Sequence, residues 1–376
     1  MTIRHLAVSG YRSLQNVVLP LDRLTLVTGA NGSGKSNLYR ALRLIVAAAR
    51  SEMVGALARE GGLPAALWAG PERLSRAMRD GEQSVQGGPR RQPLRLRLGF
   101  AADPFSYAIE LGYPQEGHTA FALDPALKGE WIWAGASFHP RAVLSSARGQ
   151  DDPDRSLFQS GADPREQPEV HVLREQILSW RFYDSFRTDA GAPARQPRVG
   201  TRCFALAGDG GDLPAAVQTI LENGDGSGLQ QAIADAFPGC HLSVSTEAGL
   251  FRLRVHQPGL LRPLDASELS DGTLRYMLLT VALFSPRLPP LLVLNEPEGS
   301  LHPDLLAPLA RLIEAAAQRT QVWVIAHAPE LIGALAAAEH CRHVPLQREL
   351  GATLVRGQTS LERGVWRWPS HTGGSR

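Results

Sequence analysis

Alternating apolar and polar residues near the start of the chain are typical of strands. The pattern predicts strands at residues 3–9 and 17–19, and an apolar run predicts a third strand at residues 24–27. Apolar residues at helical spacing follow a glycine-rich loop and predict a helix that ends near residue 50. Two strands therefore precede a strand–loop–helix unit.

Residues 94–98 alternate cleanly, and residues 105–111 resemble a partner strand, so we expect antiparallel sheet here. Arg95 and Arg97 would share one face of that sheet. In a chain whose positive charge is nearly all arginine, a solvated face is the favoured interpretation, and a DNA-facing role stays open.

The middle of the chain begins with a polar, proline-rich stretch at residues 146–168, where we place a lobe boundary. Beyond it, periodicity predicts three helices and one pair of strands. The helices lie at residues 170–180, 213–221 and 229–237, and the strands at 241–245 and 250–255.

The last third of the chain alternates apolar helices with short buried strands. The predicted elements are a helix that opens at residues 269–273 and ends at 284, a strand at 291–294, a helix at 305–317 and a strand at 322–325. This order is typical of an α/β fold with a largely parallel sheet. Such sheets bind ligands at the carboxyl ends of their strands.

Residues 29–37 read Gly-Ala-Asn-Gly-Ser-Gly-Lys-Ser-Asn and lie between the third strand and the first helix. This is the context that a phosphate-binding loop requires, because glycines let backbone N–H groups surround phosphates at a helix N-terminus. Lys35 would reach the β- and γ-phosphates, and the Ser36 hydroxyl would ligate Mg²⁺. The candidate ATP-binding residues are Gly29, Asn31, Gly32, Ser33, Gly34, Lys35, Ser36 and Asn37.

The amino-acid composition adds little to these predictions. The chain has 376 residues and a net charge of +2, so overall charge gives no strong argument for nucleic acid, and a local basic patch stays open. Its three cysteines are far apart and indicate neither a zinc site nor a disulfide framework. The start lacks the apolar core of a signal peptide and no run is long enough to span a membrane, so we expect a cytoplasmic protein without a membrane partner.

Several motifs together resemble the ABC-type ATPase heads of the RecF, SMC and OLD families, and above all stand-alone bacterial RecF-like ATPases of the AAA type. The matching segments, in chain order, are residues 10–14 (N-terminal strand and turn), 29–36 (Walker A), 269–273 (signature motif), 291–296 (Walker B), 299–303 (D-loop) and His327 (switch histidine). Taken singly, Ser270 or Asp271 is also an ordinary helix N-cap, and His327 an ordinary core histidine. Their shared order favours the functional interpretation.

The resemblance implies an α/β P-loop NTPase fold, with a mixed sheet, an antiparallel β-lobe and a helical lobe. It implies a single two-lobed head whose parts are residues 1–145, with Walker A and the antiparallel sheet, 146–262, the helical insert lobe, and 263–368, with the later motifs. Residues 369–376 would form a tail. ATP and Mg²⁺ would join two protomers head to tail, each nucleotide also meeting Ser270, Asp271 and Gly272 of the opposite protomer.

The resemblance also assigns roles. Glu296 would act as the base on attacking water, while Lys35 and His327 would contact the γ-phosphate. Arg12, in the N-terminal turn, either is solvated or reaches a phosphate, and both interpretations stay open. Of several glutamines that could serve as the Q-loop ligand of Mg²⁺, we choose Gln159.

Two residues depart from the general pattern. Asp271 stands where transporter ATPases usually carry glycine, which argues for the RecF-like branch. Asn295 replaces the Walker B aspartate and keeps one carbonyl acceptor without the charge. Hydrolysis would then be slow, or Asn295 simply caps the strand and its effect on Mg²⁺ stays open.

The function hypotheses follow from this resemblance. The leading one is a DNA-associated ATPase in genome maintenance, such as DNA repair, or in phage defence. The alternative is a slow ATP-gated scaffold or sensor for a partner effector protein, motivated by Asn295. A transporter motor subunit is disfavoured by the RecF-like start and signature.

Overall fold

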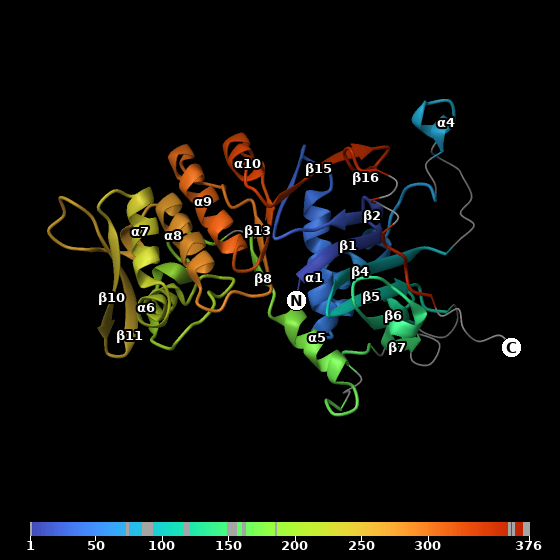
Figure 1. The fold of residues 1–376 in the computed structure, drawn as a ribbon, viewed down its shortest axis with the longest axis horizontal. Coiled ribbons are helices and arrows are strands. Elements are labelled where there is room, and N and C mark those ends of the chain that lie inside the picture. The colour runs from blue at the N-terminus through green and yellow to red at the C-terminus, as the bar shows by residue number, and fades with distance from the viewer. Residues whose placement is uncertain are drawn as a thin grey trace. The chain divides into compact units, whose positions relative to one another are not determined.

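The computed structural model describes residues 2–72, 75–84, 93–115, 120–148, 156–159, 163–184, 186–359, 362 and 365–370. The chain divides into two compact units (Figure 1). The first contains Met1–Leu21, Gly29–Ser179 and Val344–Arg376, and the second contains Asp22–Thr28 and Trp180–His343. Each unit is built from segments that lie far apart in the sequence.

The first unit contains a six-stranded sheet in the order β2-β1-β4-β5-β6-β7, with antiparallel neighbours throughout. Its strands are β1 (Thr2–Tyr11), β2 (Leu14–Pro20), β4 (Arg95–Asp103), β5 (Phe105–Gly112), β6 (Ala126–Ala134) and β7 (Val143–Arg148). Arg95 and Arg97 both contact Glu110 of the neighbouring strand, at 3.2 and 2.9 Å. The antiparallel pair and the shared face are therefore confirmed.

Helix α1 (Lys35–Ala49) packs against β1 and β4 of this sheet. Leu38, Leu42 and Ile45 recur at helical spacing and are buried, which is why the segment is a helix with an apolar stripe. The other helices of the unit are α2 (Met53–Arg59), α3 (Gly62–Ala66), α4 (Arg76–Arg79) and α5 (Pro168–Leu178), with a 3₁₀ turn, η1, at Pro140–Ala142. Near the end of the chain, β15 (Cys341–Glu349) and β16 (Ala352–Val355) form an antiparallel hairpin.

The second unit contains the parallel sheet that the last third of the sequence predicts. Strand β3 (Leu24–Gly29) lies between β14 (Gln321–Ile325) and the start of β15, and β13 (Leu291–Asn295) and β8 (Arg181–Tyr183) continue the sheet beyond β14. The pairs of β3, β14, β13 and β8 are all parallel. Every residue of β14 is buried, as expected for a central strand covered on both faces.

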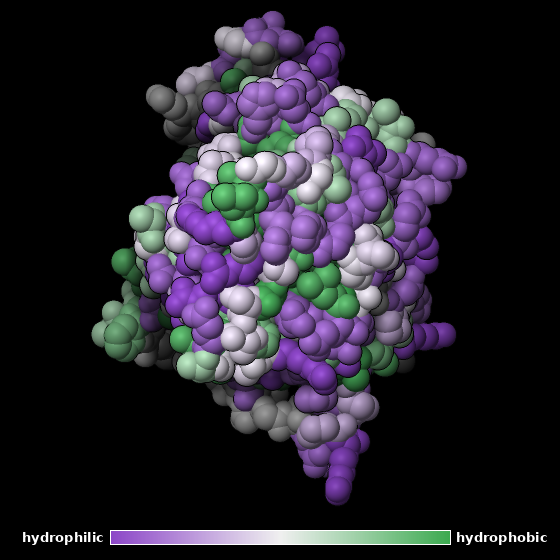
Figure 2. Space-filling view, turned by 90° about the vertical axis from the view of Figure 1, so that its left-hand side faces the viewer, coloured by the Kyte–Doolittle hydropathy of each residue, from purple (hydrophilic) through white to green (hydrophobic). Residues whose placement is uncertain are grey.

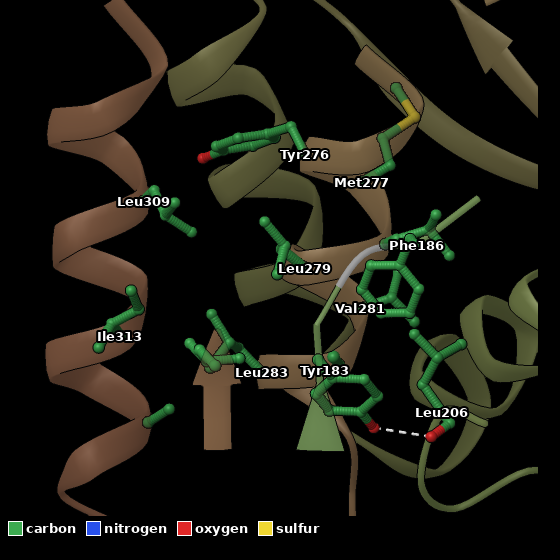
Figure 3. Close-up of a cluster of buried hydrophobic side chains, with 14 of the residues drawn as sticks. Tyr183, Phe186, Leu206, Tyr276, Met277, Leu279, Val281, Leu283, Leu309 and Ile313 are labelled. Atoms are coloured by element: carbon green, nitrogen blue, oxygen red, sulfur yellow. Dashed lines mark hydrogen bonds between the residues drawn. The ribbon is translucent and has the colours of Figure 1, made fainter. Parts of the chain in front are cut away.

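The helices of the second unit are α6 (Leu213–Asn223), α7 (Gly226–Ala236), α8 (Asp271–Phe284), α9 (Leu306–Ala317) and α10 (Pro329–Ala336), with 3₁₀ turns η2 (Pro193–Arg195), η3 (Ala266–Glu268) and η4 (Pro303–Leu305). A smaller antiparallel sheet contains β9 (Arg198–Val199), β10 (His241–Glu247), β11 (Leu250–His256) and β12 (Leu264–Asp265). Helix α8 is buried from Leu274 to Leu283, so it forms the centre of the core. Figure 3 shows Leu309 and Ile313 of α9 pointing toward this helix, and the Tyr183 hydroxyl donating a 2.7 Å hydrogen bond to the Leu206 carbonyl.

The outer face of this unit is largely polar. Figure 2 views the left-hand side of Figure 1, where hydrophilic residues cover most of the face and hydrophobic ones form small, separate islands. The large apolar side chains that the second unit exposes in the described residues are Val199, Leu260 and Leu261.

Several elements were not predicted, among them two neighbouring pairs, β6 with β7 and α2 with α3. β6 and β7 lack a simple pattern because Glu130 interrupts an apolar run while being fully buried. Helices α2 and α3 were missed because Gly61 and Gly62 mark a break that lies between two short helices. The lobe boundaries at residues 145 and 262 stay a prediction, and residues 371–376 of the expected tail lie outside the described residues.

Candidate nucleotide site

The loop between β3 and α1 has the backbone that phosphate binding needs. Gly29, Gly32 and Gly34 have φ angles of 149°, 78° and 108°, in the region that favours glycine. A Cβ on Gly34 would lie 2.0 Å from Oγ1 of Thr353, so no other residue fits there without a shift. The three glycines predicted from the sequence thus shape the loop.

The side chains of this loop fit a triphosphate and its metal. Lys35 is buried, and its Nζ donates hydrogen bonds to the carbonyls of Gly29 and Ala30, so the ammonium lies over the loop. The Ser33 hydroxyl is buried and lacks a hydrogen-bond partner in the described part of the chain. Ser36 is exposed at the start of α1, where its hydroxyl can ligate Mg²⁺.

Two further candidates near the loop are Asn31, which is exposed, and Asn37, which is half-buried. Asn31 is exposed at the tip of the loop. Asn37 lies in the first turn of α1, and its Nδ2 donates a 2.8 Å hydrogen bond to the Ser13 hydroxyl. The Asn37 amide therefore supports the loop from the side of the β1–β2 turn.

Arg12 lies in that turn with a φ of 46°. Its guanidinium is held by Glu60, with Nε 3.0 Å and Nη2 2.8 Å from the same carboxylate oxygen. The Tyr11 hydroxyl donates to the same carboxylate at 2.7 Å, and burial raises the pKa of Tyr11. Arg12 is thus paired with a carboxylate, and its contact with a phosphate stays a prediction.

Gln159 lies in a short segment that is anchored to the sheet of the first unit. Its Oε1 accepts a 3.2 Å hydrogen bond from the Ser156 backbone. The anchor is Glu130, whose carboxylate accepts hydrogen bonds from the Leu157 backbone at 2.7 Å and from the Tyr107 hydroxyl at 2.6 Å. Burial raises the pKa of Glu130. The role of Gln159 as a metal ligand stays a prediction.

The second unit brings Glu296 and His327 together. Glu296 follows β13 and has a φ of 50°, and its N–H donates a 2.8 Å hydrogen bond to the carbonyl of Ile325 on β14. His327 follows β14, and its Nε2 lies 3.0 Å from Oε1 of Glu296. The predicted base and the predicted switch histidine are therefore in contact at the carboxyl ends of neighbouring parallel strands.

Neighbouring groups hold both residues. Nη2 of Arg275, on α8, donates a 2.9 Å hydrogen bond to the Glu296 carbonyl. Oε1 of Glu298 accepts hydrogen bonds from the backbone N–H groups of His327 and Ala328. Burial lowers the pKa of Arg275, and the carboxylates of Glu298, Asp184 and Glu296 oppose that shift.

Asn295 is the last residue of β13 and pairs in register with Ile325. It is half-buried, and Glu296 beside it is exposed. Asn295, which stands where the Walker B motif has aspartate, therefore lies at the carboxyl edge of the parallel sheet, where metal ligands are expected.

The signature segment begins helix α8. Ser270 is its N-cap, and the Ser270 hydroxyl accepts a 3.2 Å hydrogen bond from the Thr273 N–H. Ser270 and Asp271 are exposed. A Cβ on Gly272 would lie 2.8 Å from the Ser300 carbonyl, so glycine lets the D-loop approach the start of the helix.

A buried arginine, Arg195, holds the start of α8 in place. The sequence gives no sign of this role, because Arg195 lies in a Pro/Arg-rich loop. Its side chain is 6% exposed, and Nη2 lies 2.8 Å from the Asp271 carboxylate. Its remaining donors bind the carbonyls of Thr188, Ala266, Ser267 and Leu269. Arg275 and Thr353 were not predicted from the sequence either, because their partners also lie outside their own local segments.

Among the described residues, no helix is both long and apolar enough to cross a membrane. No cluster of three or more His, Cys, Asp or Glu side chains in the described ranges could hold a metal. The cysteines Cys203, Cys240 and Cys341 are free, and Cys240 is buried.

A known protein family matches this chain over most of its length. A family model described as "AAA domain, putative AbiEii toxin, Type IV TA system" matches residues 24–333. A comparison with curated proteins found no match.

Two solved structures are similar in fold. One is an Smc head bound to the C-winged helix domain of ScpA, with a TM-score of 0.51, 15% identity, and coverage of 94% of this chain and 97% of that chain. The other is an Smc head domain with an extended coiled coil, bound to the C-terminal domain of ScpA and derived from Pyrococcus furiosus. Its TM-score is 0.50 at 14% identity, and the match covers 96% of this chain and 97% of that one.

These identities are low enough that the likeness concerns the fold alone. It confirms the predicted P-loop NTPase fold of the ATPase-head type, with antiparallel and parallel sheets. Because the family model spans residues 24–333, most of the chain, the protein belongs to the AAA family so described and has the P-loop ATPase fold of SMC heads.

Proposed function

We propose that this protein binds and hydrolyses ATP in an ATP-gated head-to-tail dimer that associates with DNA. The observation that carries the ATP-binding part is the phosphate loop, with three glycines at positive φ and a buried lysine over the loop carbonyls. Backbone N–H groups at a helix N-terminus bind anions, and Lys35 adds a charge that meets the β- and γ-phosphates.

The proposed Mg²⁺ ligands follow from where the strands of the parallel sheet end. The phosphate loop starts at the residue after Thr28, at the carboxyl end of β3, and β13 ends at Asn295 in the same parallel sheet. Carboxyl ends of parallel strands meet at one edge. Ser36 and Asn295 would hold Mg²⁺, with Gln159 as a further ligand, and bound Mg²⁺ would stabilise the negative charge on the transferred phosphoryl group.

The hydrolytic step would use the pair at the carboxyl ends of β13 and β14. The Glu296 carboxylate would orient a water molecule and accept its proton, and the contact with His327 Nε2 at 3.0 Å keeps that carboxylate in one orientation. His327 would contact the γ-phosphate, and Lys35 would stabilise the developing charge. This chemistry needs no residue beyond those already described.

The dimer assignment rests on the exposed start of α8. Ser270 and Asp271 are exposed, and the helix N-terminus that they begin attracts anions. We propose that Ser270, Asp271 and Gly272 of one protomer contact the γ-phosphate of ATP bound by the other. ATP would then join the protomers, and hydrolysis would release them.

DNA is the proposed partner on the strength of the RecF-like resemblance, with genome maintenance, such as DNA repair, or phage defence as the setting. A second candidate function, a slow ATP-gated scaffold for an effector protein, is favoured by one observation: Asn295 lacks the charge of a Walker B aspartate. Fast hydrolysis that DNA stimulates contradicts the scaffold, and tight ATP binding with negligible turnover supports it.

The deciding experiment measures ATP binding and steady-state hydrolysis, with and without duplex or single-stranded DNA at fixed salt, because protein–DNA affinity depends steeply on salt. Lys35→Ala should abolish both binding and turnover, since it removes the charge that meets the phosphates. Arg43→Ala, a cation on the same helix beside Tyr39, is the control. Unchanged nucleotide affinity in Lys35→Ala would show that the loop does not bind ATP.

A further inference from the structure

We propose that Thr353, on β16, is a positioning residue that holds the phosphate loop in its nucleotide-binding shape. The inference rests on the proposed ATP binding and adds a residue to that site. Thr353 and its partner Ser13 both lie outside the residues 24–333 that the family model matches. Neither residue belongs to the loop that it supports.

Three hydrogen bonds, two of them buried, connect Thr353 to the loop and to helix α1. Thr353 Oγ1 donates to the Ser33 carbonyl at 2.8 Å and lies 2.7 Å from the Ser13 hydroxyl. Asn37 Nδ2 donates to that same Ser13 hydroxyl at 2.8 Å. The β16 backbone adds a fourth link, because the Thr353 N–H donates to the Ser13 carbonyl at 2.8 Å.

The donor and the acceptor in each of these hydrogen bonds can be assigned by starting from the Ser33 carbonyl. The Ser33 carbonyl can only accept, so the single hydroxyl proton of Thr353 is used there. Thr353 must then accept from Ser13, and Ser13 in turn accepts from the Asn37 amide. Each hydroxyl donates once and accepts once, so the chain has one orientation and points toward the loop.

The consequence for the loop concerns a peptide plane. In a trans peptide the C=O and the following N–H point in opposite directions. Because Thr353 holds the Ser33 carbonyl, the N–H of Gly34 is directed to the other side of that plane, away from β16. Backbone N–H groups that all face one side are what a phosphate cradle needs.

Packing supports the same role. A Cβ on Gly34 would lie 2.0 Å from Thr353 Oγ1, and a Cβ on Gly29 would lie 2.5 Å from the Leu346 carbonyl of β15. Thr353 itself is 1% exposed. The β15–β16 hairpin is therefore in close contact with the loop at two of its glycines, and a shift of the hairpin would move the loop.

The test compares Thr353→Val with Thr353→Ser. Valine keeps the shape but loses the hydroxyl, so the Ser33 carbonyl is left unpaired and the Gly34 N–H is no longer directed. We expect Thr353→Val to weaken ATP and ADP binding about tenfold or more, measured by calorimetric titration, and Thr353→Ser to stay within about threefold of the wild type. Thermal unfolding without nucleotide is measured in parallel.

Thr219→Val is the matched control. Thr219 is buried, donates to the Ala215 carbonyl at 2.7 Å and accepts from the Cys203 N–H at 3.0 Å, but lies on α6 in the second unit. It should lower the unfolding temperature as Thr353→Val does and leave nucleotide affinity unchanged. Ser13→Ala, which removes the donor that orients Thr353, gives a second measurement if Thr353→Val does not fold, and should weaken binding in the same direction.

Each outcome decides something. Tight binding by both Thr353→Val and Ser13→Ala overturns the positioning role while the ATP site stands. Equal weakening by Thr353→Ser and Thr353→Val also overturns it, because the hydroxyl would then not be the group that matters. A wild-type protein that binds no nucleotide overturns the proposed ATP site and this inference with it.

Discussion

Glu296 and His327 are hydrogen-bonded across neighbouring strands, with His327 Nε2 3.0 Å from Glu296 Oε1. The two residues follow β13 and β14, which are parallel and paired in register up to Asn295 and Ile325. This hydrogen bond orients the Glu296 carboxylate at the carboxyl edge of the parallel sheet, and the role of Glu296 as a general base stays a prediction.

Replacing Glu296 with Gln should separate binding from hydrolysis. Glutamine keeps the size and one carbonyl acceptor but cannot take a proton, so turnover should fall by about 10²–10⁴-fold while ATP affinity is retained. Steady-state turnover and nucleotide titration check this, with Glu314→Gln, an exposed carboxylate on α9, as the matched control. Turnover that stays normal in Glu296→Gln would remove the residue from the mechanism.

The dimer is tested in the Glu296→Gln background, where slow cleavage should accumulate a species of twice the monomer mass with ATP and Mg²⁺ but not with ADP. Ser270→Arg should remove that species, because a bulky side chain at the start of α8 blocks the opposite nucleotide. Light scattering after gel filtration measures the mass.

Because Ser270 is also an N-cap, its replacement by a residue that cannot cap, such as Arg or Ala, costs about 1 kcal/mol of helix stability. Ser270→Ala is therefore the control: it loses the cap without adding bulk and should still dimerise. A dimer that tolerates Ser270→Arg, or a Glu296→Gln protein that stays monomeric with ATP, contradicts the head-to-tail arrangement.

Asn295→Asp should lower the Mg²⁺ concentration that hydrolysis requires. The new carboxylate restores a charge at the end of β13, and hard cations prefer charged oxygen ligands. Titrating Mg²⁺ at saturating ATP gives the half-saturating concentration, which should fall, and turnover should rise if metal placement limits the rate. An unchanged Mg²⁺ requirement would mean that asparagine is an adequate ligand.

Arg195→Lys should weaken the ATP-dependent dimer and leave ATP binding by the monomer unchanged. Lysine keeps the charge but offers one point of donation, so it cannot hold the carbonyls of Ala266 and Leu269 together with the Asp271 carboxylate. Light scattering at several protein concentrations measures the loss. Arg187→Lys, an exposed arginine paired with Asp189, is the control and should have no effect.

The sequence predicted those elements whose formation depends on residues close together in the chain. The phosphate loop, α1 and strands β3, β13 and β14 follow from runs of neighbouring residues, and the structure has them where the sequence places them. The contacts of Arg195 and Thr353 could not be predicted in the same way. Both depend on partners far along the chain, which the spacing of residues does not encode.

Strand β6 shows another limit. Its polar Glu130 reads as a break in an apolar run, yet it is fully buried because Tyr107, Ser156 and the Leu157 backbone donate to its carboxylate. A buried charge is tolerated when such donors surround it. Since two of those donors come from a later segment, no pattern within β6 itself could reveal the strand.

Strand β3 also has a consequence for how the protein is made. Its neighbours in the sheet are β14 and β15, so Leu26 pairs with Val324, close to the other end of the chain. Contacts between such distant residues form late, because a long loop must close first. During synthesis β3 therefore has no sheet partner until β14 and β15 have left the ribosome. The phosphate loop that follows β3 would therefore take its final shape only after those later strands have formed.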